Sequence, residues 1–382
     1  MESSKEKKNR PKIAELDIVR AFAILAVVLI HATADATART GESPLALGEG
    51  SLTQMVFVAV NRMSLFAVPL FLFISGVVLF YRYYDSWNLK QAAGFYRKRI
   101  VSSIIPYVLW SFIYYVFNQW LFTRTVVIEW VPFLKMLRWA DVGYHLYFMI
   151  IIIQFYLLFP LMMTAVKSSA VLRQLMVPIG FGIQAGFYAC NHSVAPLAHR
   201  PSLAVTYIGV FMLGGFLGIH YGAFMQWMRR GALAVLPASV LGGAALGALY
   251  LNDRYGSGGF GHTWFEVTQN LYAMLLGMAL IWVGAVLTPK APGLHRFLLA
   301  LGSASFGIYL AHPALLSLYR YGMAPTGSML SYDLYMLLGF LWPLLGSWFL
   351  AWAYGRVNKG LRGRKPSSVP PGVRAQEKAA NG

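Results

Sequence analysis

The sequence predicts an all-α protein: a polytopic transmembrane bundle of about ten helices with both termini in the cytoplasm. Of its 382 residues, 58% are hydrophobic and only 12% are charged, whereas soluble domains usually carry about 25% charged residues. Apolar runs of about 20 residues recur along the chain, and each is long enough to cross a bilayer as a helix. The lysines and arginines concentrate in alternate connecting segments, as in membrane proteins of fixed orientation.

Ten apolar runs follow one another along the chain. They cover residues 15–34, 58–81, 100–122, 145–166, 173–190, 202–221, 232–251, 266–287, 297–318 and 333–355. The fifth and seventh runs are the least regular, because glutamines and glycines dilute them. We expect a transmembrane domain over 15–357, preceded by a basic cytoplasmic N-terminus (1–14). The segment 358–382 is basic and rich in Pro, Gly and Ser, which predicts a disordered cytoplasmic tail.

The distribution of positive charge predicts the orientation. If the N-terminus is cytoplasmic, 23 of the 32 lysines and arginines fall in inside segments and 8 in outside segments, with Arg20 inside the first run. Cytoplasmic loops carry such an excess, and an even number of crossings returns the C-terminus to the same side. The net charge of +18 therefore reports topology. No basic stripe interleaved with aromatic residues indicates nucleic acid as a partner.

The first run carries charged residues that a lipid-facing helix would exclude. Arg20 and His31 are eleven residues apart, which places them on one helix face about 16 Å apart along the axis. Ionisable groups within a membrane usually face a polar cavity or a partner. Asp35 would share that face if the helix continues, and its carboxylate would orient a catalytic imidazole. Alternatively, Arg20 snorkels or pairs with Asp17, and His31 only caps the helix.

Further polar residues interrupt two other runs, the ninth and the fourth. Ser305, Tyr309 and His312 form one stripe in the ninth run, and His312 lies at about the same depth as His31, so that one cavity could hold both. The alternative for this stripe is hydrogen bonding between helices. His145 and Tyr147 begin the fourth run within "GYHLYF", either as cavity residues or as part of an aromatic belt.

Small residues suggest close packing of helices. Ser75 and Gly76 either allow close approach or expose a hydroxyl to a cavity, and Gly214 with Gly218 predicts a packing surface. The remaining histidines lack the spacing of metal ligands, and the single cysteine, Cys190, excludes a disulfide framework. We therefore expect no metal site and no permanently bound cofactor.

The chain resembles the membrane-bound acyltransferase family 3, the bacterial O-acyltransferases of surface carbohydrates. The hallmark is an arginine, ten residues and a histidine, here Arg20 and His31 after "ELDIVR". Four further landmarks follow in order: "VPLFLFISGVVLFY", "FYRKRIVSSIIPYVLW", "HLYFMIIIIQFYLLFPLM" and "LGSASFGIYLAHP". The resemblance spans most of residues 13–318 and indicates the standalone membrane-domain type. One departure is Ser102, which stands where many members have a second basic residue three positions after the arginine corresponding to Arg99.

The resemblance implies an enzyme of the bacterial cytoplasmic membrane that acylates a glycan. Acyl-CoA, with acetyl most expected and succinyl as an alternative, would serve as co-substrate, and a polysaccharide or lipid-linked sugar would be the acceptor. Arg20, Arg97, Lys98 and Arg99 would bind the donor's phosphates, and the alternative for the last three is simple positive-inside anchoring. His31, Asp35 and His312 would be catalytic. Asp17, Ser75, His145, Tyr147, Ser305 and Tyr309 would line the cavity.

Two rival interpretations remain at this point. A ten-helix protein with buried Arg and His could be a transporter of an organic acid or a flippase of a glycan intermediate, although no inverted repeat between the two halves is evident. The basic N-terminus and the A-x-A run at residues 32–34 also resemble a secretory signal peptide. Asp17 and Arg20 interrupt its apolar core, and cleavage would remove His31.

Overall fold

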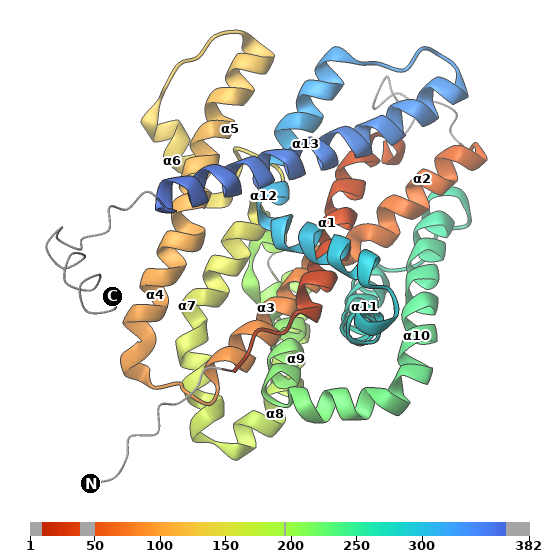
Figure 1. The fold of residues 1–382 in the computed structure, drawn as a ribbon. Coiled ribbons are helices and arrows are strands. Elements are labelled where there is room, and N and C mark those ends of the chain that lie inside the picture. The colour runs from red at the N-terminus through yellow and green to blue at the C-terminus, as the bar shows by residue number, and fades with distance from the viewer. Residues whose placement is uncertain (1–9, 39–49, 195, 364–382) are drawn as a thin grey trace, which may run out of the picture.

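The computed structural model describes residues 10–38, 50–194 and 196–363, and these form a bundle of α-helices (Figure 1). The first helices are α1 (Glu15–Ala32), α2 (Leu52–Met63), α3 (Ala67–Tyr83), α4 (Ala92–Arg99), α5 (Ile105–Thr123), α6 (Trp130–Trp139) and α7 (Tyr147–Ser168). The remaining ones are α8 (Ala170–Ser193), α9 (Ile208–Ile219), α10 (Tyr221–Tyr255), α11 (His262–Lys290), α12 (Pro292–Gly322) and α13 (Met329–Gly363). No strand occurs among these residues, so the all-α prediction is confirmed.

Each of the ten predicted apolar runs contains a helix, but the helices differ in how well they suit a membrane. In the described part of the chain, eight are long and apolar enough to cross one, which makes this a multi-pass membrane protein. The first run corresponds to α1, which has 18 residues but includes Glu15, Asp17 and Arg20. The sixth corresponds to the shorter segment 204–219. For these two the predicted crossing stays a prediction.

Several helices extend beyond the predicted runs. α2 and α3 join through a single 3₁₀ turn (Ser64–Phe66) into one span of 32 residues, and α4 continues into α5 through a π-helical segment (Ile100–Ile104). α13 reaches Gly363, past the predicted domain boundary at 357. Most of the predicted N-terminal segment and the tail beyond residue 363 lie outside the described residues.

The segments predicted to share a side of the membrane meet in the structure. At one end, Arg10 pairs with Asp85 at 2.5 Å, and Lys167 donates to the carbonyl of Trp87 at 2.6 Å. At the other end, Arg254 donates to the carbonyl of Ala38 at 2.7 Å, and the rings of Trp139 and His199 stack at 4.6 Å. The segments that carry Arg10, Asp85 with Trp87, and Lys167 are predicted to be cytoplasmic. Those that carry Ala38, Trp139, His199 and Arg254 are predicted to lie outside. We call these ends the inner end and the outer end.

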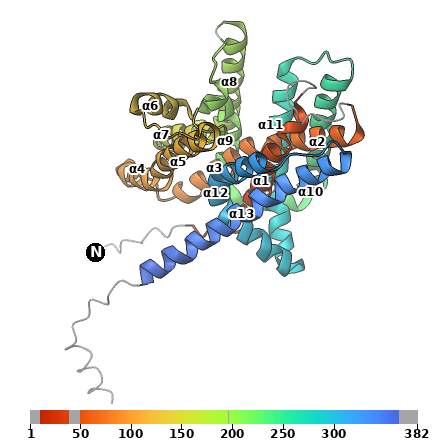
Figure 2. The ribbon, with the colours of Figure 1, turned by 90° about the horizontal axis from the view of Figure 1, so that it is seen from above.

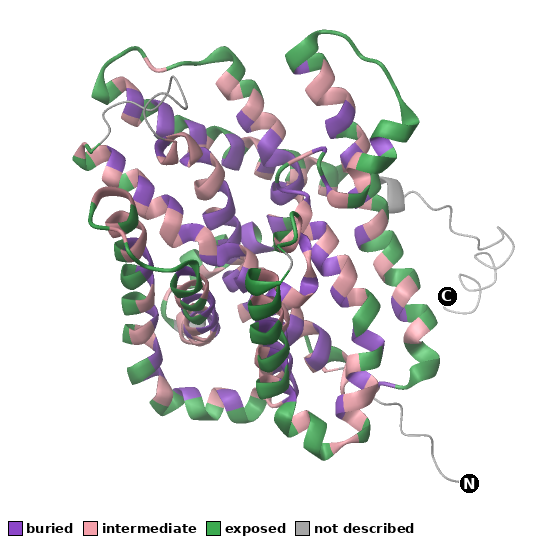
Figure 3. Ribbon diagram, turned by 180° about the vertical axis from the view of Figure 1, so that it is seen from behind, coloured by how far each residue is buried: buried purple, intermediate pink, exposed green. Residues whose placement is uncertain are grey.

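α1 and α3 lie in the middle of the bundle, whereas α8 and the helices α4 to α6 lie at its edge (Figure 2). In the apolar window of the α2–α3 span 67% of residues are buried, against 17% in that of α8. Exposed positions accordingly cover the peripheral helices (Figure 3). Many of them are large and apolar, such as Ile179 and Ile183 of α8, as expected of a surface that faces lipid tails.

Glycines let two pairs of helix backbones touch. A Cβ on Gly302 of α12 would lie 1.7 Å from the carbonyl oxygen of Asp17 in α1. A Cβ on Gly214 of α9 would lie 2.1 Å from the carbonyl oxygen of Phe73 in α3. Only glycine fits such approaches, which is how small residues stabilise helix pairs in membranes. The packing predicted for Gly214 is therefore observed, and it fixes α9 against α3.

Candidate active site

One face of α1 borders two cavities. The inner one, of about 340 Å³, is lined by Arg10, Pro11, Lys12, Ile13, Leu16, Arg20, Val78, Tyr81 and Arg82. We call it the arginine cavity. The other, of about 110 Å³, is the histidine cavity. It is lined by Val27, Ile30, His31, Leu65, Val68, Phe71, His145, Tyr147, Phe148, Tyr207, Gln269 and Tyr309. Arg20 lines the arginine cavity and His31 lines the histidine cavity, and residues of α3 line both. The two side chains therefore lie on the same face of α1, as their spacing predicts.

Two histidine rings stack beside the histidine cavity. The ring centroids of His31 and His312 lie 5.4 Å apart with their planes 25° from parallel. His312 is fully buried and stands behind His31. Its Nδ1 lies 2.9 Å from the carbonyl oxygen of Ile308. Because a carbonyl can only accept, Nδ1 carries the proton and Nε2 is left with a lone pair. Within the described residues this buried Nε2 has no hydrogen-bond partner.

A third histidine closes the same wall. The ring of His145 lies 5.9 Å from that of His312, and its backbone carbonyl accepts from the hydroxyl of Tyr309 at 2.6 Å. His145 is only 2% exposed, which fits a cavity residue better than an aromatic belt. Tyr147 and Tyr309 line the histidine cavity as well. The structure therefore gathers four predicted site residues from α1, α7, α12 and the segment before α7 around one space.

Tyr114 of α5 inserts into the backbone of α12 next to His312. Its hydroxyl donates to the carbonyl of Leu310 at 2.7 Å and accepts from the amide of Ala314 at 3.2 Å. These two groups are four residues apart, and Pro313 lies between them without an amide hydrogen of its own. A side chain inserted in this way opens the helical ladder locally. It fixes the place in α12 from which the His312 side chain projects.

Asp35 does not contact the imidazole that it was expected to orient. α1 ends at Ala32, and Asp35 lies in a separate 3₁₀ turn, Ala34–Thr37. Its Oδ2 pairs with Nη2 of Arg320 at 2.7 Å. The same nitrogen donates to the backbone carbonyl of His31 at 2.9 Å. Asp35 therefore acts on the backbone of His31 through Arg320, because the helix stops before it could bring the carboxylate onto the ring face.

At the inner end, Arg20 and Asp17 form the pair expected for residues three apart. Asp17 is also bonded to Lys12, so that one buried carboxylate meets two cations. Arg10, Lys12, Arg20 and Arg82 all line the arginine cavity. Only Asp17 and Asp85 of the described acidic residues pair with any of these four. The cavity is therefore positively charged and suits an anion. Asp17 belongs to this inner site and does not line the histidine cavity.

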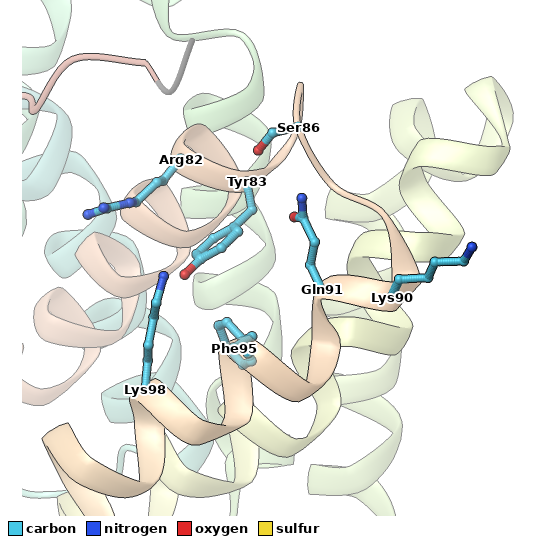
Figure 4. A pocket seen from close by; sticks show the side chains of 8 residues that line it. Arg82, Tyr83, Ser86, Lys90, Gln91, Phe95 and Lys98 are labelled. Carbon is cyan, nitrogen blue, oxygen red and sulfur yellow. The ribbon is translucent and has the colours of Figure 1, made fainter. Parts of the chain in front are cut away.

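A second basic space opens beside the first at the inner end. This basic groove of about 440 Å³ is lined by Arg82, Tyr83, Ser86, Lys90, Gln91, Gly94, Phe95 and Lys98. In Figure 4, Lys98 points from its helix toward the Tyr83 hydroxyl and Arg82, whereas Lys90 points away from them. Arg82 lines both spaces. It joins the groove to the arginine cavity as one cationic surface.

The three basic residues of the α4 end separate into three environments. Lys98 lines the basic groove. Arg97 is exposed and lines neither basic cavity. The guanidinium of Arg99 lies over the rings of Tyr156 and Phe95, at 4.6 Å and 5.1 Å from their centroids, and so packs toward α7. Of the three, Lys98 is the one that shares a groove with other cationic side chains, where an anionic ligand would meet several of them.

A family model described as an acyltransferase domain, that of acyltransferase family 3, matches residues 13–352. The chain belongs to acyltransferase family 3. Comparisons with curated proteins and with solved structures gave no significant match. The family resemblance read from the sequence is thus confirmed. Together with the eight apolar helices it makes this protein a membrane acyltransferase, a transferase of groups other than aminoacyl groups.

The two predicted serines of the acyltransferase do not line the histidine cavity. Ser75 donates its hydroxyl to the carbonyl of Phe71 at 2.8 Å. It shares one face of α3 with Phe71 and Val78, which line the histidine and arginine cavities respectively. Ser75 therefore lies between the two. Ser305 is buried in α12, one turn before Tyr309.

Sequence reasoning did not single out three residues that the acyltransferase places at its site. Tyr144 lies against the ring of His31 at 4.6 Å, Arg320 holds the backbone of His31, and Arg82 joins the two basic spaces. For Arg82 a signal existed, since it continues the face of α3 that carries Phe71 and Val78. Tyr144 and Arg320 gave none, because only the meeting of distant segments brings them to α1.

Proposed function

We propose that this acyltransferase moves an acyl group from acyl-CoA at the cytoplasmic side to a hydroxyl of a glycan at the outer side. The proposal rests on one observation: the face of α1 that is turned toward α3 borders both cavities. Arg20 stands at a cationic cavity at the inner end, and His31 stands at a second cavity three turns further along. A charged donor and a hydroxyl acceptor can therefore approach one another from opposite ends.

The inner end offers a site for the phosphates of the donor. Arg82, Lys98 and Arg20 present cationic groups to the basic groove and the arginine cavity, and bonds between such groups and phosphate oxygens are charge-assisted. The extended pantetheine arm would then follow the seam between α1 and α3 past Ser75. The distance from Arg20 to His31 along the axis, about 16 Å, suits an extended arm that carries a thioester at its end.

His31 is the residue best placed to act as general base, because it borders the cavity and is only half-buried, whereas His145 on the same cavity is 2% exposed. The sugar oxygen attacks the thioester carbonyl while His31 takes its proton. The carbon–sulfur bond breaks, and the thiolate receives that proton, which leaves an ester and free CoA thiol. His312 supports the ring from behind. Two stacked imidazoles repel each other when both are charged, so the pair takes up at most one proton beyond the N–H that each neutral ring carries.

The resemblance to the family supports a further proposal about the transferred group and the setting. We propose acetyl as the group, with succinyl as the alternative, and a surface or exported polysaccharide, or a lipid-linked sugar, as the acceptor. The protein would act in the bacterial cytoplasmic membrane, with its inner end in the cytoplasm. A histidine cavity closed to bulk water would suppress hydrolysis of the thioester.

The test is acyl transfer by the purified protein in lipid nanodiscs. Surface polysaccharide from the producing cell is first freed of its esters with mild alkali and then incubated with radiolabelled acetyl-CoA or succinyl-CoA. We expect free thiol and labelled polysaccharide in equal amounts, and His31→Ala should abolish both. His192→Ala, an exposed histidine at the end of α8, serves as the control and should retain activity. Movement of a saccharide across the membrane without acyl transfer would instead favour a transporter.

A further inference from the structure

A second pocket lies at the outer end, next to the histidine cavity. This outer pocket has a volume of about 160 Å³ and is formed by parts of α8, α10 and α11 and the turns before α9. Its walls include Tyr188, Arg200, Tyr250, His262, Glu266 and Asn270. The segments around residues 200 and 262 are those predicted to face outward. The pocket is therefore open to the side from which an exported glycan would come.

The outer pocket adjoins the histidine cavity directly. Tyr207 and Gln269 line both spaces. Gln269 is held in place, because its Nε2 donates to the carbonyl of Leu65 at 3.0 Å. A molecule seated in the outer pocket would thus lie across these two side chains from His31. The arrangement extends the proposed reaction path to the outer surface.

The charged residues of the outer pocket compensate one another. Arg200 pairs with Glu266 at 2.5 Å, and Nε2 of His262 lies 3.2 Å from the same carboxylate oxygen. The guanidinium of Arg200 also lies over the ring of Tyr188, 5.4 Å from its centroid. With cation and carboxylate already paired, the described residues of the pocket offer no isolated charge for an acidic or an amino sugar. The pocket keeps polar edges that can hydrogen-bond hydroxyls, beside several aromatic rings.

One buried group in the outer pocket needs a donor. Asn270 is 8% exposed, and its Nδ2 donates to the carbonyl of Glu266 at 2.9 Å. Its Oδ1 is buried without a hydrogen-bond partner in the described part of the chain. Leaving such an acceptor unpaired costs about 1–3 kcal/mol. A hydroxyl donated by a ligand would remove that cost, whereas an acyl chain could not.

We propose that the outer pocket binds one neutral hexopyranose residue of the acceptor glycan. The ring would rest among the tyrosines with a hydroxyl on Asn270 Oδ1, and a neighbouring hydroxyl would pass between Tyr207 and Gln269 to His31. This assignment rests on the proposed acyl transfer. It adds the subsite that selects the acceptor.

The experiment measures the acceptor and donor KM separately. Methyl β-D-glucopyranoside, methyl β-D-galactopyranoside and methyl α-D-mannopyranoside serve as acceptors, with acetyl-CoA as donor. Asn270→Leu and the conservative Glu266→Gln should raise the acceptor KM at least tenfold and leave the donor KM unchanged. Lys98→Ala should raise the donor KM and leave the acceptor KM unchanged. Lys135→Ala, an exposed lysine of α6, should change neither.

Binding of the same glycosides, followed by saturation-transfer NMR without donor, separates the two proposals. If no acyl transfer occurs to any acceptor, the proposed function fails, and the NMR still decides the pocket. Loss of the glycoside signals in both variants, with unchanged melting temperatures, supports the assignment. It is overturned if the variants bind like the wild type, or if the wild type binds none of the three neutral glycosides. Preference for methyl glucuronide or methyl glucosaminide would also overturn it.

Discussion

Arg320 of α12 donates from Nη2 to the backbone carbonyl of His31 at 2.9 Å, across 289 positions of the chain. The same nitrogen pairs with Asp35 at 2.7 Å. The end of α1 is thereby tied to α12, the helix that carries His312. The ring of His31, the proposed general base, is positioned by a contact to its own backbone, and we expect the precision of its placement to depend on Arg320.

Arg320→Ala should therefore lower kcat about tenfold, which corresponds to about 1.4 kcal/mol in the activation barrier. The donor KM should stay within twofold, because Arg320 lies far from the basic groove. Steady-state kinetics with acetyl-CoA would measure both. Arg124→Ala removes another arginine of the outer end, one that lies against Tyr321, and should leave kcat unchanged. Equal losses in the two variants would contradict a positioning role.

The proposed donor site predicts different effects for substitutions of neighbouring basic residues. Lys98→Ala should raise the donor KM about tenfold, because a hydrogen bond to a charged group contributes about 1.5–3 kcal/mol. Arg82→Ala should raise it more, since Arg82 lines both basic spaces. Arg97→Ala provides the matched control and should have no effect. Titration of acyl-CoA at low and high salt would check this, and similar behaviour of Arg97 and Lys98 would refute the assignment.

The contact between α1 and α12 makes a prediction about stability. Gly302→Ala would place a methyl group 1.7 Å from the carbonyl oxygen of Asp17, and backbone cannot yield as a side chain can. Overpacking typically costs about 1–3 kcal/mol, and here we expect the upper end or failure to fold. Gly293→Ala in the same helix meets nothing within 4 Å and should be neutral or slightly stabilising. Melting temperatures in detergent would compare them, and similar values would show that the helices separate easily.

Burial raises the pKa of the Asp35 carboxyl, and the nearby Arg320 only partly opposes that effect. The folded state thus holds this proton more tightly than the unfolded chain, in which the pKa is about 3.9. Wild-type protein should lose stability relative to Asp35→Asn as the pH rises from about 4 to neutrality. The difference should grow in an Arg320→Ala background. Melting curves across this range would test it, and a difference that is independent of pH would contradict it.

Orientation can be tested with Cys190, the single cysteine of the chain, which is exposed near the end of α8. The charge distribution places this end outside. A membrane-impermeant maleimide should therefore label Cys190 in intact cells. In a Cys190→Ser background, Ser168→Cys at the end of α7 should react only after the cells are permeabilised. Labelling of Ser168→Cys but not Cys190 in intact cells would invert the topology.

The sequence predicted correctly which side chains share a face when those side chains belong to a single helix. The eleven-residue spacing of Arg20 and His31 predicts a shared face, and the structure has both on the α3 side of α1. The polar stripe of the ninth run likewise brings Tyr309 and His312 to the same wall. Helical periodicity is a local property, and it needs no knowledge of partners.

Features that depend on several segments could not be predicted. Arg97, Lys98 and Arg99 look alike in the sequence, since any of them satisfies the positive-inside rule, and only the packing of α4 against α3 and α7 separates them. Asp35 was expected to orient the ring of His31, but the end of α1 at Ala32 and the partner Arg320 decide otherwise. The outer pocket combines residues from five segments, which no single pattern reveals.

The glycine contacts have a consequence for how substrates enter and leave. Gly302 lets α12 pack closely against α1, and Gly214 lets α9 pack closely against α3. Each pair of helices would therefore move as one rigid body. The arginine cavity and the histidine cavity both lie where the two pairs meet, between α1 and α3. A rocking motion of one pair against the other would then widen the route that we propose for the thioester arm, and the reverse motion would close it after the thiol has left.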